Sequence, residues 1–465
     1  MLTYEPTIES LRRYRVPEWY RDAKLGIYTH WGPYSVPAFG DEWYPRNMYD
    51  KSHDCHRHHR GVWGEPSEFG YKDFIPMFRA EAWDPERWAD LFVRAGAKFA
   101  GPVIEHHDGF AMYDCSFTPY TSVKMGPRRD VTLESKEAFE AAGLRFIATS
   151  HRARNARHFP SLPGSDRNDP AYRDLYGDVF EDKDAPVDEA FLKDWLGRTK
   201  EAIDLYTPDV LWFDFGWHRP EFLPYRLDLV AYFYNQAEQR GQEVVMNYKD
   251  DVFDGAAVYN VERGKLAGIR PDSWQTDTSI STKSWSFIEN ENLKSPTRVV
   301  HDLVDIVSKN GNMLLNVGPR PDGTIPPEAE GILLALGDWL AVNGEAIYSS
   351  RVWHRFGEGP TAVEAGHFSE RKDQDFTPRD VRYTTKPNTL YAICLGWPGR
   401  TARLRALATG TGLGPDNIRS VRMLGVDGPL DWRQDHEALH VGLPDRRPCD
   451  HAYALALDLK EAPAC

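Results

Sequence analysis

Cysteine is scarce in this sequence of 465 residues. Its five cysteines are scattered, odd in number and without a CxxC pair: Cys55, Cys115, Cys394, Cys449 and Cys465. Such usage indicates neither a disulfide framework nor a zinc ribbon, and it fits a reducing compartment best.

Long apolar runs are also missing. No run reaches the roughly 18 residues that a membrane-spanning helix needs. The first twenty residues, MLTYEPTIESLRRYRVPEWY, contain no apolar core of a signal peptide. We therefore expect a soluble protein with no membrane partner and a cytoplasmic location.

Positive charge is in deficit, with 56 Lys and Arg against 70 Asp and Glu and a formal net charge of -14. Because binding to a nucleic acid or an anionic membrane takes a basic face, neither partner is expected. A neutral, polyhydroxylated substrate stays open. The 15 Trp and 22 Tyr suit a cleft for sugar rings, although an aromatic core explains most of them.

Amphipathic helices and apolar strands alternate along the first three quarters of the chain. At residues 84–105, Asp84 and Pro85 are typical of a helix start, apolar residues then recur at helical spacing, and Gly96 precedes an apolar strand. Eight segments are expected to be strands, at residues 24–30, 98–105, 145–149, 210–214, 243–247, 257–262, 273–277 and 312–318.

Strands that are apolar throughout and alternate with helices predict a parallel sheet covered on both faces. Eight of them favour a (β/α)8-like TIM barrel, although an open doubly wound sheet would give a similar pattern. After residue 352, short alternating runs between Gly, Pro and Asp predict an antiparallel β-sandwich. We therefore expect a (β/α)8-like barrel, the catalytic domain, at 1–352 and a C-terminal β-sandwich domain at 353–465.

In such a barrel, reactive groups gather at the carboxyl ends of the strands. Polar side chains follow several of the expected strands: His30, His106, His107, Asp214, Asn247, Glu262, Gln275 and Asp277. Carboxylates and imidazoles that converge on one rim, together with indoles, are what acid/base and nucleophilic work on a glycosidic bond requires.

Each of these residues has a plainer alternative. Asp214 could cap a helix, although the absence of a Gly-rich turn weakens that alternative. His106 and His107 could be structural. Glu262 could form a surface ion pair with Arg263, which follows it. Pattern alone leaves these alternatives open.

Two further stretches are rich in His or Arg. The 45–80 region is expected to be a lid or rim of the pocket, and its cluster at 53–59 matches no standard zinc spacing. A mobile His-rich loop is therefore favoured there over a metal site. The stretch HRARNARH at 151–158 could bind phosphate, but a loop at the pocket rim is favoured.

Six motifs occur in the order GIYTHWGPYSVP, DEWY, EHHDGF, VLWFD, SKNGNMLLNVGPRPDGTIP and WLAVNGEAIY. Over residues 17–353, the chain resembles the α-L-fucosidases of glycoside hydrolase family 29. The resemblance implies a catalytic barrel followed by a β-sandwich. It also implies hydrolysis of a fucosylated oligosaccharide or glycoconjugate, with retention of configuration and with no metal or other cofactor.

The resemblance also assigns the site. Asp214 takes the place of the family's nucleophile. Glu262 lies close to where related enzymes place the acid/base, with Asp277 and Glu42 as runners-up. The C5 methyl group of fucose needs an apolar wall, for which Phe39, Phe287 and Trp285 are candidates. The expected substrate-binding residues are His30, Glu42, Trp43, His106, His107, Trp212, Asn247 and Trp285.

Three departures from the family pattern bear on the leaving group and the linkage. The family's lysine before HHDGF is Glu105 here, and its Trp-Glu pair on a late strand is Trp274 and Gln275. A Tyr-Ser stretch is replaced by ATSHRAR, so the family's tyrosine there cannot be carried over. The His and aromatic residues of the 45–80 insertion are expected to border the subsite for the leaving group.

Two other function classes stay open. A metal-dependent barrel hydrolase would use His30, His106, His107 and Asp214 as ligands and would lose activity to chelators. A non-catalytic fucose-binding protein would keep the histidines and aromatics but lack a competent acid. The sequence does not decide which fucosyl linkage is cleaved, or whether transfer of fucose to sugars competes with hydrolysis. It also leaves open whether the chain forms a homo-oligomer.

Overall fold

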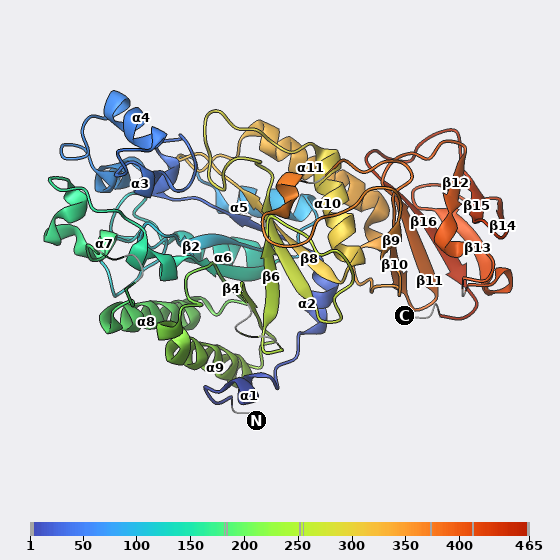
Figure 1. Cartoon of the computed structure of the whole chain (residues 1–465), viewed down its shortest axis with the longest axis horizontal. Coiled ribbons are helices and arrows are strands. Elements are labelled where there is room, and N and C mark those ends of the chain that lie inside the picture. Colours follow the sequence, from blue (N-terminus) through green and yellow to red (C-terminus); the bar gives the residue numbers. More distant parts are fainter. Residues whose placement is uncertain are drawn as a thin grey trace.

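The structure is a computed structural model that describes residues 4–180, 182, 185–250, 253, 255–372, 374–411 and 413–462. Its larger part is a closed barrel of parallel strands in sequence order, in which β8 pairs with β1 (Figure 1). The predicted barrel is therefore confirmed. Its strands are β1 (Leu25–Thr29), β2 (Phe99–Glu105), β3 (Arg145–Ser150), β4 (Val210–Phe213), β5 (Val245–Tyr248), β6 (Val258–Glu262), β7 (Trp274–Ser279) and β8 (Gly311–Val317).

Helices cover most of the barrel, and none of those described is long and apolar enough to span a membrane. Among the described residues of the 249–257 and 263–273 connections no helix forms, so the barrel lacks helical cover beside β6. The helices are α1 (Ile8–Leu11), α2 (Glu18–Ala23), α3 (Tyr44–Asn47), α4 (Asp54–Val62), α5 (Pro85–Arg94), α6 (Val131–Ala141), α7 (Arg173–Tyr176), α8 (Glu189–Tyr206), α9 (Leu223–Arg240), α10 (Pro296–Ser308) and α11 (Pro327–Asn343).

Helices α5 and α10 begin at capping residues, each followed by a proline. Asp84 caps α5, since its carboxylate accepts a hydrogen bond from the backbone N–H of Arg87 at 2.9 Å, and Pro85 lies in the first turn. Ser295 caps α10 in the same way. A side-chain cap of this kind contributes about 1 kcal/mol to stability.

Alternation along the strands decides which side chains reach the interior of the barrel. On β4, Val210 and Trp212 belong to the apolar cluster inside the barrel, whereas Leu211 and Phe213 pack outward against the helices. The next inward position is residue 214. Asp214 therefore ends the strand with its carboxylate facing the interior at the carboxyl end of the barrel.

Strand β2 departs from strict alternation. Relative to β3 it contains an extra residue between Val103 and Glu105, and such a bulge re-aims the side chains that follow. Glu105 points outward, where its carboxylate accepts a hydrogen bond from Arg198 of α8 at 3.0 Å. His106 consequently reaches the interior.

The C-terminal part consists of two antiparallel sheets that enclose their own apolar core, as predicted for a β-sandwich. It lies beside α10 and α11 (Figure 1), and Arg382 forms a buried ion pair with Asp305 of α10 at 2.6 Å. The larger sheet has the order β13 (Ile418–Met423), β16 (Tyr453–Leu459), β11 (Thr389–Cys394), β10 (Val381–Lys386), β9 (Gly357–Glu358), and the smaller β12 (Thr401–Leu404), β15 (Leu439–Gly442), β14 (Trp432–Gln434).

The His-rich cluster at 53–59 lies largely in helix α4, so the prediction of a mobile loop is wrong there. His56 Nδ1 lies 2.6 Å from the carbonyl oxygen of Met48. His59 contacts the Tyr44 hydroxyl at 3.0 Å and the Phe69 carbonyl at 2.8 Å. These buried histidines hold the insertion together.

Candidate active site

A cavity of about 480 Å³ opens at the carboxyl ends of the barrel strands. Residues that are far apart in the sequence meet at this rim, because the barrel strands all end there. Phe39, Phe287 and the histidines of the 45–80 insertion do not line it, so of the three candidates for the apolar wall only Trp285 does. The predicted site residues that do line it are His30, Glu42, Trp43, His106, His107, Trp212, Asp214, Glu262, Asp277 and Trp285.

Asn247 was predicted to bind substrate, but it does not line the cavity. Its side chain is fully buried, and its amide donates a hydrogen bond to the Tyr20 hydroxyl at 3.2 Å. That hydroxyl donates in turn to Gln275 Oε1 at 2.8 Å. Asn247 and Gln275 therefore belong to a polar network in the layer of the barrel below the site, which corrects the prediction for Asn247.

Lys249 is the central residue that sequence analysis missed. Its ammonium lies 2.8 Å from Asp214 Oδ1, 2.6 Å from Glu262 Oε2 and 3.4 Å from Asp277 Oδ2, and its side chain is 1% exposed. Lys249 follows Val245 and Asn247 at the next inward position. Had the alternation of β5 been continued two residues past Asn247, the sequence would have predicted it.

The surroundings of Asp214 keep its carboxyl group ionised. Burial alone would raise its pKa, but the Lys249 ammonium and a contact from His107 hold the pKa of Asp214 well below its usual range. His107 Nε2 lies 3.3 Å from Asp214 Oδ2. Its Nδ1 donates to the carbonyl of His151 at 2.9 Å, which fixes the ring.

The pKa of Glu262, which contacts the same Lys249 ammonium, shifts in the opposite direction. Burial raises its pKa to about 7, with the Lys249 ammonium opposing this rise and the charges of Asp277 and Asp214 adding to it. Two adjacent carboxyl groups whose pKa values are pushed apart are the arrangement that a nucleophile and a general acid require.

The two runner-up acids bind protein groups instead. Asp277 is 1% exposed, and the Asn260 amide and the Tyr28 hydroxyl donate to its two oxygens. Glu42 Oε2 accepts from the Trp285 backbone N–H at 2.9 Å, and burial raises the pKa of Glu42 to about 8. Glu42 thereby positions Trp285. Asp277 Oδ2 lies 3.4 Å from the Lys249 ammonium, farther than Glu262 Oε2 at 2.6 Å.

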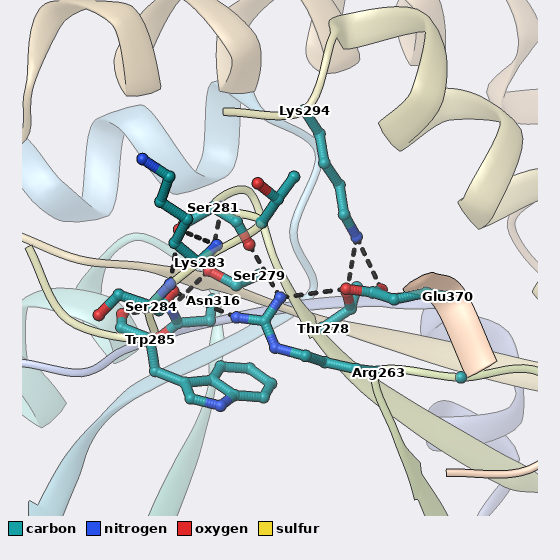
Figure 2. Close-up of polar contacts among 12 residues, drawn as sticks. Arg263, Thr278, Ser279, Ser281, Lys283, Ser284, Trp285, Lys294, Asn316 and Glu370 are labelled. Atoms are coloured by element: carbon teal, nitrogen blue, oxygen red, sulfur yellow. Dashed lines mark hydrogen bonds and ion pairs between the residues drawn. The ribbon is translucent and has the colours of Figure 1, made fainter. Parts of the chain in front are cut away.

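Trp285 is also held from two other directions, as Figure 2 shows. The Asn316 amide donates to its carbonyl at 2.6 Å, and the guanidinium of Arg263 lies 4.3 Å from the centre of its ring. Arg263 also donates to the carbonyls of Ser281 at 2.8 Å and Ser284 at 3.1 Å. Arg263 is therefore buried within the site and makes no surface ion pair with Glu262.

Neutral imidazoles form one wall of the cavity. Burial lowers the pKa of His30 to about 3, and it lowers the pKa values of His106 and His151 well below their usual range. The Nδ1 atoms of His106 and His151 are buried and have no hydrogen-bond partner among the described residues. His151 stands in the ATSHRAR stretch, where the resemblance offered no residue.

Ring nitrogens of His30, His106 and His151 also lie within 4.8 Å of one another and could hold a metal ion. The metal-dependent alternative predicted His30, His106, His107 and Asp214 as ligands. The observed trio contains His151 in place of His107, whose ring contacts Asp214.

The departure from the family pattern at Glu105 has a structural explanation, since its carboxylate is buried between Arg198 and Arg152.

Comparisons with known proteins place the chain among fucosidases over both domains. A family model described as alpha-L-fucosidase matches residues 2–345, and one described as alpha-L-fucosidase C-terminal domain matches residues 373–458. The tissue alpha-L-fucosidase of Rattus norvegicus is 30% identical over 96% of this chain and 89% of its own length. The plasma alpha-L-fucosidase of Homo sapiens is 29% identical over 98% of this chain and 92% of its own.

Solved structures agree. A crystal structure of the Thermotoga maritima alpha-fucosidase in complex with a mechanism-based inhibitor has a TM-score of 0.80 and 31% identity, covering 98% of this chain and 100% of that one. An alpha-L-fucosynthase from the same organism, in complex with α-L-Fuc-(1-2)-β-L-Fuc-N3, has a TM-score of 0.79 and 30% identity over the same shares. The chain therefore belongs to the α-L-fucosidase family, glycoside hydrolase family 29, and is a glycoside hydrolase.

Proposed function

We propose that this protein is a retaining exo-α-L-fucosidase, which removes terminal α-L-fucose from oligosaccharides or glycoconjugates through a covalent fucosyl-enzyme. The observation that carries the proposal is the buried bridge from Asp214 through Lys249 to Glu262. It holds two carboxyl groups close together with their pKa values pushed apart.

The spacing of these carboxyl groups supports retention. Lys249 Nζ lies 2.8 Å from Asp214 Oδ1 and 2.6 Å from Glu262 Oε2, so these two oxygens can be no more than the sum, 5.4 Å, apart. Retaining glycosidases place their carboxyl groups about 5 to 5.5 Å apart, whereas inverting enzymes need about 6.5 to 9.5 Å to admit a water molecule.

In the first step, a carboxylate oxygen of Asp214 attacks the anomeric carbon of the α-fucoside. Glu262 donates its proton to the glycosidic oxygen as the bond between that oxygen and the anomeric carbon breaks. Since Lys249 donates to Glu262 Oε2, the acidic proton is assigned to Oε1. The leaving group departs as an alcohol and leaves a β-fucosyl ester on Asp214.

In the second step, Glu262 acts as a base. It takes a proton from a water molecule, whose oxygen attacks the anomeric carbon from the side that the leaving group vacated. The ester bond to Asp214 breaks, and α-L-fucose is released. Lys249 and His107 stabilise the carboxylate of Asp214 as it departs.

The cavity wall suits the sugar. His30, His106 and His151 offer neutral ring nitrogens to the hydroxyl groups, and Trp285 offers an apolar face to the C5 methyl group. A sugar of the wrong configuration would leave buried groups unpaired, at about 1 to 3 kcal/mol each.

The test is turnover of an aryl α-L-fucoside against matched aryl α-L-galactoside and β-L-fucoside. We expect hydrolysis of the α-fucoside in clear preference. Binding of fucose without turnover of even this activated substrate would contradict the proposal and favour the non-catalytic fucose-binding class.

The pH profile should follow from the two carboxyl groups. The active form has Asp214 charged and Glu262 protonated, so kcat/KM should fall as pH rises through about 7, the pKa of Glu262. On the acid side, activity should persist below the usual pKa of aspartate. For Glu262→Gln, kcat/KM on an activated aryl fucoside should no longer fall at high pH. If the same fall persisted, it would have to come from the titration of another group.

Lys249→Met should weaken both the fold and the site. Removing the ammonium takes away the one cation that contacts Asp214, Glu262 and Asp277 together, so we expect the free energy of unfolding to drop by about 3 to 5 kcal/mol. The pKa of Asp214 should rise, which would move the acid limb of kcat/KM to higher pH. Lys249→Arg keeps the charge and serves as the control, and an acid limb unmoved in Lys249→Met would contradict this role.

A chelator should have no effect on the rate, whereas zinc should inhibit. We expect EDTA to leave the rate on an aryl fucoside unchanged, because the proposed chemistry uses carboxyl groups and no metal ion. Added Zn²⁺ should inhibit in competition with substrate, since three neutral imidazoles can ligate it. Loss of activity in EDTA that a metal ion restores would instead favour the metal-dependent class.

A further inference from the structure

Residues 366–371 lie between the parts of the chain that the two family models match, which end at 345 and begin at 373. By sequence they follow β9 of the C-terminal domain. In space they lie against the barrel, on the side where the 263–273 connection provides no described helix. This 366–371 segment belongs to the active site.

Backbone hydrogen bonds fix the segment along the last residue of β6 and the residues that follow it. The N–H of Gly366 donates to the carbonyl of Lys265 at 2.9 Å, that of Phe368 to Glu262 at 2.7 Å, and that of Glu370 to Arg263 at 3.0 Å. The segment is therefore docked directly on the end of β6, which carries Glu262, and on the residues after it.

Side chains reinforce this docking. The backbone N–H of Glu262 donates to His367 Nδ1 at 3.0 Å. The buried carboxylate of Glu370 accepts from Arg263 at 3.0 Å and from Lys294 at 2.9 Å, and Figure 2 shows it between these two cations. A buried carboxylate satisfied on both oxygens holds the segment in one position.

The docked segment presents two side chains to the mouth of the cavity. Phe368 is 44% exposed and lies beside Phe215, with ring centres 6.4 Å apart and an angle of 30° between the ring planes. Arg371 is exposed and lines the same mouth. Phe215 is partly buried and also lines the cavity, so the exposed ring of Phe368 beside it is a platform on which the first sugar of a leaving group can stack.

Positive charge predominates among the exposed residues at the mouth of the cavity, although the whole chain carries a net negative charge. Of the charged residues described as lining the cavity, those that are partly or fully exposed are three cations, Arg154, Lys283 and Arg371, and one carboxylate, Asp41. Among the described residues, none of these three cations forms an ion pair; Arg154 lies 4.8 Å from the centre of the Trp43 ring, and Lys283 donates to a backbone carbonyl. In a chain of net charge -14, such a cationic mouth favours an anion.

We propose that the 366–371 segment, with Arg154 and Lys283, forms a leaving-group subsite for a glycan that carries an anionic group, either a sulfate ester or a carboxylate. Phe368 packs on the sugar next to fucose, and the cations bind the anion. This inference rests on the proposed fucosidase function, because the bound glycan is the leaving group of that reaction.

The experiment compares kcat/KM for fucosyl disaccharides in three matched forms: neutral, bearing a sulfate ester, and bearing a uronic acid carboxylate on the second sugar. We expect at least one anionic form to exceed the neutral form by about tenfold at low salt, as charge-assisted hydrogen bonds allow. High salt should reduce this preference, because the cations are exposed.

Arg371→Gln should lower the anionic-to-neutral ratio by about tenfold, Arg371→Lys should restore part of it, and Arg446→Gln, an exposed arginine of the C-terminal domain, should leave it unchanged. Equal rates on neutral and anionic forms, or a ratio that Arg371→Gln does not alter, would overturn this inference. An enzyme inactive on the neutral aryl α-L-fucoside would instead overturn the proposed function, so the two failures are distinguishable.

Discussion

Asp214→Ala is expected to lower kcat/KM for an aryl α-L-fucoside by about four orders of magnitude, because it removes the nucleophile of a covalent mechanism. Lys249 and the imidazoles stay in place, so the variant should still bind fucose. The cavity left by the carboxylate should admit azide, which attacks from the same side and yields β-fucosyl azide. Rates with and without azide, with the azide product identified by NMR, check this expectation.

Asp214→Asn is the matched variant. It keeps the size of the side chain and leaves no space for azide, so it should be inactive and remain so when azide is added. An Asp214→Ala enzyme that kept a substantial part of the parent's rate would remove Asp214 from the role of nucleophile.

Glu262→Ala should have the second largest effect, and its size should depend on the leaving group. Loss of a general acid/base costs about 10²- to 10⁴-fold. With an activated aryl fucoside the first step needs little acid, so the fucosyl-enzyme should form and accumulate. Azide, which needs no general base, should then attack it and release α-fucosyl azide at an increased rate.

The control is Asp277→Asn, since Asp277 is the nearest other carboxyl group and contacts the same ammonium. It should show neither the dependence on the leaving group nor azide rescue. If Asp277→Asn showed both and Glu262→Ala behaved like the parent, the acid/base would be Asp277.

Much of this site follows from elementary features of the sequence. The eight strands were predictable because strands buried on both faces are apolar throughout. Asp214 could be predicted because period-two alternation from Val210 and Trp212 points the residue at 214 into the barrel. The same rule predicts Lys249 from Val245, two residues beyond Asn247, where the apolar pattern of the strand ends.

Other features depend on contacts that no local pattern encodes. The bulge in β2, which sends Glu105 outward, appears only when β2 is paired with β3. The docking of Glu370 onto Arg263 joins residues that are far apart in the chain. The histidines of α4 looked like metal ligands or a mobile loop because sequence shows neither the carbonyls that they bond nor their burial.

The stereochemistry of the first product tests the central claim most directly. Hydrolysis of an aryl α-L-fucoside, followed by proton NMR before the sugar mutarotates, reports which anomer leaves the enzyme. A double displacement on Asp214 predicts that α-L-fucose appears first and β-L-fucose only later. If β-L-fucose appeared first, water would be attacking the substrate directly, and the covalent role of Asp214 would be contradicted.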